Sequence, residues 1–415
     1  MKTRYKVLII LAAVVGLLGA AAMVTLVILS MDEPPPDDSD LQVHRLDVAE
    51  DENGYTYLRE AGKVLWWPGY DSGAAYADAG FPEEPERQKD PVEMEKAERL
   101  EKIAAGKDWD DVLVDEVLAH NAETFALIEK ALACPHFQVP PVLSIFTRVP
   151  EIFDWLSLMN LQAVRARAFF KRGREKQAFD EALKIVRTGH TIQGAKGCLI
   201  HYSVGQTVKL RGLEVMRQML PATVLDAKQL KACAKSLVSH DANEDGLTDA
   251  FRVEYQIAKQ AIDDVATGKQ SLALRGLPGL FETPNRLVFQ PNRTKRLLAE
   301  DHRATIESLG SPYAAMAFPE MPEPQTWRLW LPGNSVGEYL RVLSASPMMA
   351  YTILVLKCQE NVEVAATRVL LAMKAFKGEK GRLPKTWWKE ENPGFEEDVE
   401  PEIWQLPDPS FPIEF

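Results

Sequence analysis

Residues 163–186, AVRARAFFKRGREKQAFDEALKIV, decide the fold that the sequence predicts. Apolar side chains recur every three to four residues on both sides of Gly173, which is the spacing of an amphipathic helix. Gly173 itself lies in the polar run KRGRE, which interrupts the pattern and indicates a turn. The stretch therefore predicts two consecutive helices joined by a tight turn.

The same helical periodicity extends through most of the chain. It recurs over residues 111–133, 152–173, 174–192 and 203–220. Proline- and glycine-containing runs such as CPHFQVPP and MLPATV separate these segments, and no run shows the sustained two-residue alternation of a strand. The sequence therefore predicts an all-α protein built from antiparallel helical hairpins.

One of these hairpins resembles a tetratricopeptide unit. A helix of small and aromatic residues ends at Gly173, and Ala178 lies five residues further on, where that family has its close-contact alanine. The resemblance covers about 30 residues, lacks the large residue expected near Ala182, and no 34-residue repeat recurs. It implies hairpin packing of tetratricopeptide type without a repeat array, and an ordinary helical bundle with a glycine turn fits the same residues.

The N-terminus has the pattern of a membrane anchor. Lys2, Arg4 and Lys6 precede an uncharged run over residues 7–31, which exceeds the roughly 20 residues needed to span a bilayer. Cations before the run and acids after it predict a cytoplasmic N-terminus, with the bulk of the chain outside the inner membrane. The alternative is a cleaved signal peptide with its site near residues 20–22, although the apolar run is long for one.

Charge and cysteine content restrict the partners and the compartment. The three leading cations contribute +3 to a net charge of −12, so the remainder carries about −15, which disfavours nucleic acid and anionic lipid as partners. No CxxC pair occurs among the four cysteines, so a dense disulfide framework is excluded. Buried free thiols are expected, and one long-range bridge is the alternative. These cysteines are Cys134, Cys198, Cys233 and Cys358.

Composition divides the chain into six segments. The run DEPPPDDSD predicts a stiff, solvated stalk after the anchor. The segments are an anchor over 1–31, the stalk over 32–47, a helical-hairpin ectodomain over 48–312, a proline-rich connection over 313–346, a long helix over 347–384 and an extended aromatic tail over 385–415.

The C-terminal region carries a second resemblance. The run GEKGRLP after a helix is similar to the turn and short tail of pseudopilins, although residues 7–31 lack the acid of a pseudopilin helix. Together with the anchor, the segment DENGYTYLREA at 51–61 and the hairpins, the layout resembles a class of membrane-anchored helical envelope proteins of planctomycete-type bacteria. No activity is assigned to that class, so the resemblance implies a location and an architecture only.

The run DANEDGLTDAF at 241–251 is the best candidate for a metal site. Asp241, Asn243, Asp245 and Asp249 have the spacing of a calcium-binding loop between two helices. Arg252 stands where calcium needs a bidentate carboxylate, so calcium is disfavoured. The alternative is a helix start, in which Asp241 forms a capping box with Glu244 or Asp245 caps the following helix. We expect the helix start and no cofactor.

Three further groups of residues in the sequence are weaker candidates for a functional site. Cys134 and His136 would need to pack against Cys198 and His201 to bind a metal, and satisfied core residues are the alternative. The acidic cluster at 110–116 could supply acid and base groups for glycan hydrolysis, but acids at a helix start are the usual explanation. The tryptophan pairs Trp66–Trp67 and Trp387–Trp388 could stack on sugars or seal the ends of a core.

No nucleotide-binding, metalloprotease or hydrolase motif occurs in the sequence. The sequence therefore predicts a membrane-tethered, extracytoplasmic scaffold that binds a protein or peptide in a groove between its helical hairpins. An envelope hydrolase that acts on glycan is the alternative.

Overall fold

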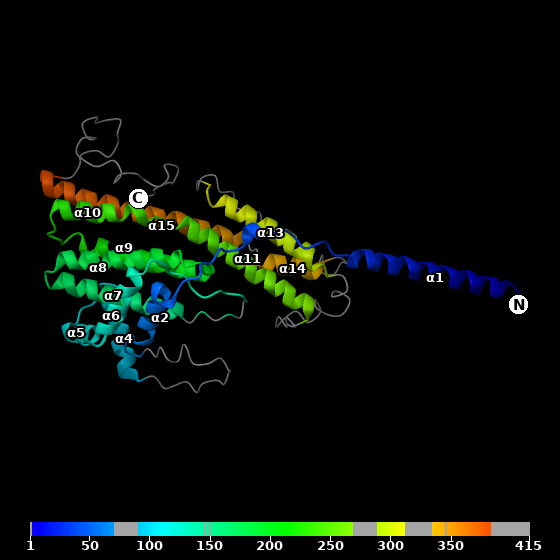
Figure 1. The fold of residues 1–415 in the computed structure, drawn as a ribbon, viewed down its shortest axis with the longest axis horizontal. Helices are drawn as coiled ribbons and strands as arrows, with labels where there is room; N and C mark the ends of the chain where they lie inside the picture. Colours follow the sequence, from blue (N-terminus) through cyan, green and yellow to red (C-terminus); the bar gives the residue numbers. More distant parts are fainter. Residues whose placement is uncertain are drawn as a thin grey trace, which may run out of the picture.

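The chain folds into helices, as the periodicity predicts. A computed structural model describes residues 2–69, 90–144, 147, 149, 151–268, 289–311, 334–344 and 347–382. Its α-helices are α1 (Lys2–Ser30), α2 (Gly54–Lys63), α4 (Pro91–Ala104), α5 (Asp111–His120), α6 (Ala122–Ala133), α7 (Glu151–Lys171), α8 (Glu175–Gln193), α9 (Leu199–Met219), α10 (Ala227–Ser236), α11 (Glu244–Thr267), α13 (Pro291–Ser308), α14 (Ser335–Ser344) and α15 (Pro347–Lys380). Short 3-10 turns η1 (Ser39–Leu41), η2 (Glu50–Glu52) and η3 (Val238–His240) join some of them. The all-α class is confirmed (Figure 1).

The hairpin of α7 and α8 forms around Gly173. That glycine has a φ of 72°, in the left-handed region where a side chain is strained. The backbone N–H groups of Gly173 and Arg174 donate to Phe170 O and Phe169 O, which satisfies carbonyls left open at the end of α7. Ala178, in the first turns of α8, is fully buried. The predicted helix–turn–helix is confirmed.

Helices α8 and α9 approach each other closely because both carry glycine at their crossing. A Cβ atom at Gly189 would lie 2.4 Å from the carbonyl oxygen of Gly205 and 2.4 Å from the backbone nitrogen of Lys209. No side chain fits between two backbones at that distance. The glycines therefore fix how α8 and α9 pack.

Four clusters of buried apolar residues hold the helical body that the structure describes, and the two largest form a larger and a smaller core. The larger core spans α2, α4–α10 and the second half of α15, and it includes Trp155, Phe179 and Leu371. The smaller core lies between α11, α13 and α14, with Tyr255 and Leu298 fully buried. In Figure 1, α11, α13 and α14 lie next to one end of the main bundle, between it and α1 along the long axis.

Helix α1 projects away from this body along the long axis of the molecule (Figure 1). Apolar side chains along it are exposed, including Leu17, Leu18 and Val24. Among the residues that the structure describes, no helix is long and apolar enough to cross a membrane. The predicted span is therefore not confirmed.

The structure alters two of the predicted segments. The connection over 313–346 contains a helix, α14, whose Val336 and Leu340 are buried in the smaller core. The segment over 32–47 is docked onto the helical body rather than standing free of it, and most of its side chains are exposed. The long helix over 347–384 appears as α15, whereas the tail over 385–415, with Trp387 and Trp388, lies outside the described residues.

Candidate functional site

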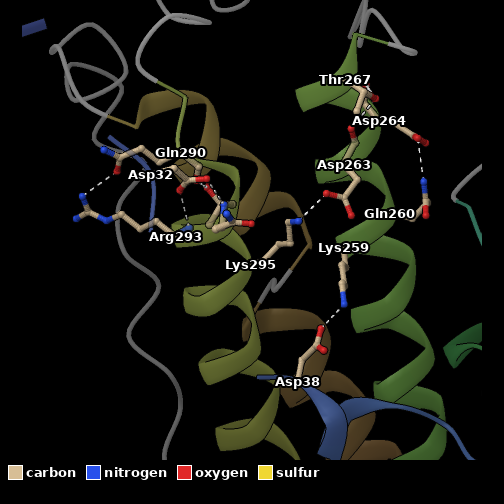
Figure 2. A network of polar contacts seen from close by, with 12 residues as sticks. Asp32, Asp38, Lys259, Gln260, Asp263, Asp264, Thr267, Gln290, Arg293 and Lys295 are labelled. Carbon is tan, nitrogen blue, oxygen red and sulfur yellow. Dashed lines mark hydrogen bonds and ion pairs between the residues drawn. The ribbon is translucent and has the colours of Figure 1, made fainter. Parts of the chain in front are cut away.

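The acidic segment that follows α1 is docked onto α13 and α11. Both carboxylate oxygens of Asp32 accept backbone N–H groups of the first turn of α13, from Asn292 at 2.9 Å and from Arg293 at 3.2 Å. Glu33 pairs with Arg296, and Figure 2 shows the contacts around Asp32. The arrangement contradicts the predicted solvated stalk. Acids at a helix N-terminus are stabilised by the helix dipole, which explains why the segment binds there.

Further along, the docked segment (residues 32–41) buries two of its side chains, Asp38 and Leu41. The carboxylate of Asp38 accepts hydrogen bonds from Lys259 at 2.5 Å and from the hydroxyl of Tyr255 at 2.7 Å. Burial alone would raise the pKa of Asp38, but these two hydrogen bonds hold that pKa below its usual value. Leu41 is 1% exposed and packs into the smaller core. The segment is therefore part of the fold.

A surface cleft of about 440 Å³ lies across α6, α7 and α8. Phe169 and Leu183 supply apolar surface in it, and both side chains are only partly buried. The guanidinium of Arg165 stacks over the ring of Phe125 at 3.8 Å, which holds one wall of the cleft in place. An open, mixed apolar and charged cleft of this size suits a peptide side chain better than an enclosed small-molecule site would.

The charges of the cleft are paired except for one cation. Arg165 pairs with Glu181, Lys184 pairs with Glu129, and Asp180 pairs with Lys176 of the same helix. Arg187 is exposed and forms no ion pair with any residue that the structure describes. The cleft therefore presents one unneutralised guanidinium beside apolar surface.

A fully buried ion pair joins α9 to α15 in the interior. Lys209 and Glu360 are both 0% exposed and in direct contact. Gln193 donates to the two carboxylate oxygens of Glu360 at 3.0 and 2.9 Å, and Lys209 also donates to Asp241 O at 3.0 Å. Burial lowers the pKa of Lys209 and raises that of Glu360, while their mutual attraction opposes both shifts. The pair is enclosed by helices, so it supports the fold rather than a reaction.

The loop over 241–252 is the start of α11. Asn243 caps the helix, because its side chain accepts the backbone N–H of Gly246 at 2.8 Å. Asp245 lies in the first helical turn, and Asp249 pairs with Arg252 at 3.0 Å. The described carboxylates here do not gather into a group that could hold a metal ion. The helix-start interpretation is supported, but the capping residue is Asn243 rather than Asp241 or Asp245.

The acidic cluster at 110–116 also begins a helix. Asp110 caps α5 by accepting the N–H groups of Val112 and Leu113. Asp115 pairs with Arg172 and Glu116 with Lys96, so these carboxylates have cationic partners rather than a substrate cavity. Trp66 stacks on His120 with ring centroids 4.4 Å apart, and Trp67 is buried. Their packing fits the role of sealing a core end.

The cysteine and histidine candidates are only partly brought together. Cys198 Sγ lies 3.2 Å from His201 Nδ1 in the first turn of α9, and His201 Nε2 lies 3.5 Å from Glu151. Cys198 and His201 are 4% and 1% exposed, so a substrate has no path to them. Cys134 instead contacts backbone carbonyls of Asp51 and Lys130. All four cysteines are free thiols, and the four-residue metal site does not form.

No protein-family model, curated protein or solved structure matches this chain.

Proposed function

We propose that the protein is a membrane-tethered scaffold of the cell envelope that binds a segment of a partner protein in the cleft across α6–α8. Helix α1 supports the tether, because it carries the uncharged run over 7–31 and the side chains that the structure describes between residues 13 and 30 are exposed, apolar ones included. The three cations before that run favour a cytoplasmic N-terminus and an extracytoplasmic body.

The observation that carries the binding role is the unpaired Arg187 beside Phe169 and Leu183. An exposed guanidinium next to apolar surface recognises a carboxylate that is flanked by an apolar side chain. Because the other lining charges are already neutralised in pairs, a partner need supply only that one acid. The proposed ligand is thus a peptide segment in which an acidic residue is flanked by an apolar residue.

A charge reversal in the cleft tests this role. A photo-crosslinking amino acid at Gln177, which lines the cleft, is expected to trap a partner in living cells. Arg187→Glu should reduce the crosslinked product about tenfold or more, since loss of one charge-assisted contact costs about 1.4 kcal/mol. Arg187→Lys should retain most of it.

The matched control is the same crosslinker at Ala304, an exposed position of α13 away from the cleft. It should trap no such product. Equal trapping from Ala304, or trapping from Gln177 that is unchanged by Arg187→Glu, would show that the cleft is not the binding site.

A further inference from the structure

The contacts at the end of α1 leave no spacer between the apolar helix and the body. Gln290, which directly precedes α13, donates from Nε2 to the carbonyl of Met31 at 2.9 Å. Asn292 donates from Nδ2 to the carbonyl of Glu33 at 2.8 Å, and Asp32 binds the backbone of the same turn. Figure 2 shows Gln290, Arg293 and Asp32 gathered at this end of α13. A free ten-residue stalk could instead hold the body about 33 Å away.

From these contacts we infer that the body rests directly on the membrane, with the first turn of α13 in the lipid headgroup layer. The inference rests on the proposed role of α1 as a membrane span. The apolar run over 7–31 would be about 37 Å long as a helix, against about 30 Å of hydrocarbon, so Met31 emerges in the headgroup layer. Because Met31 is bonded to Gln290, the start of α13 lies at the same depth.

The chemistry of this turn suits lipid phosphate. Arg293 is exposed, and its guanidinium donates to Gln290 Oε1 at 3.1 Å but forms no ion pair with a residue that the structure describes. The nearby cations already form ion pairs, Arg296 with Glu33 and Lys295 with Asp263. Arg293 is thus the cation of this turn that remains for a headgroup phosphate, even though the body as a whole is acidic.

Three positions along helix α13 can report how far the body lies from the membrane. Arg293, Glu300 and Glu307 are all exposed and lie seven residues apart, about 10.5 Å per step along one face of the helix. Each is replaced singly by cysteine and labelled with an environment-insensitive fluorophore in the full chain. The label at position 293 removes the guanidinium, so quenching there reports the depth set by the docked segment and not the phosphate contact. The proteins are placed in phosphatidylcholine vesicles that contain 20% phosphatidylglycerol and a headgroup nitroxide lipid, and the signal of the four natural cysteines is subtracted.

We expect strong quenching at position 293, weaker quenching at 300 and little at 307. Equal and weak quenching at all three positions would show that the body stands off the membrane and would overturn the inference. A label at Val15→Cys, quenched by a nitroxide in the acyl chain, reports on α1 separately. If Val15 is not quenched, the proposed membrane span itself fails; if only Val15 is quenched, the span stands and the inference fails.

A charge exchange tests whether the docked segment sets the depth of the first turn of α13 in the headgroup layer. Glu33→Arg breaks its pair with Arg296 and should lower the quenching at position 293. The double variant Glu33→Arg/Arg296→Glu reverses the pair and should restore most of that quenching. Unchanged quenching in Glu33→Arg would show that another contact holds the body at the membrane.

Discussion

Replacing Lys209 with methionine is expected to lower the free energy of unfolding by about 3–5 kcal/mol, the usual cost of breaking a buried ion pair. Among the residues that the structure describes, the substitution leaves the buried carboxylate of Glu360 with the two hydrogen bonds from Gln193 alone. A buried charge without its counterion is far less stable than the same charge in water. Denaturant unfolding followed by circular dichroism at pH 7 measures the effect.

Two further variants separate the buried charge from the loss of a lysine. Lys209→Met/Glu360→Met removes both charges and should recover a large part of the loss, because neither charge then remains buried alone. Lys231→Met removes another link to α15, the pair with Glu379, whose side chains are 34% and 38% exposed. That variant should cost no more than about 1 kcal/mol. An equal cost for Lys209→Met and Lys231→Met would refute the buried-pair interpretation.

Gly189→Ala is expected to have the second-largest effect, a loss of about 1–3 kcal/mol from overpacking. The new methyl group would meet backbone atoms of Gly205 and Lys209, which cannot rotate away as a flexible side chain can. The loss should appear although alanine favours a helix by about 1 kcal/mol over glycine. Thermal and denaturant unfolding of the variant measure the balance of the two effects.

The matched control is Gly378→Ala on α15, where a Cβ atom would meet nothing within 4 Å. Only the helix propensity acts there, so stability should stay the same or rise by up to about 1 kcal/mol. Opposite signs for the two substitutions are the expected result. If both raise the stability, α8 and α9 do not cross as closely as the structure places them.

The helical hairpins were predictable because their signal is local. The spacing of apolar residues around Gly173 defines α7 and α8, and Ala178 is buried between them and their neighbours. The docked segment was not predictable, because Arg296, which binds Glu33, and Arg303, which binds Asp40, each lie 263 positions beyond their partner. From its composition, an acidic, proline-rich run is predicted to be solvated. The contacts that dock this run onto the body are tertiary, so the local sequence does not show them.

The buried ion pair was missed for a related reason. A lysine in a helix is normally a solvated residue, and the sequence does not show that α15 covers Lys209. One signal was present, since the helical neighbours Gly205, Gly212 and Leu213 form a small, apolar face around Lys209. A charge on such a face predicts a buried partner. The capping role of Asn243 was likewise within reach, because asparagine is among the preferred N-cap residues.

The tether by α1 is the claim on which the account depends most, and a phosphatase fusion tests it directly. Alkaline phosphatase, which folds actively only outside the cytoplasm, is fused after Phe415 of the full chain, and its activity is measured in membranes washed with alkaline carbonate. We expect active enzyme that stays in the washed membranes. Activity released into the soluble fraction would show that residues 1–31 are cleaved as a signal peptide, and an inactive fusion would place the body in the cytoplasm; either result contradicts the account.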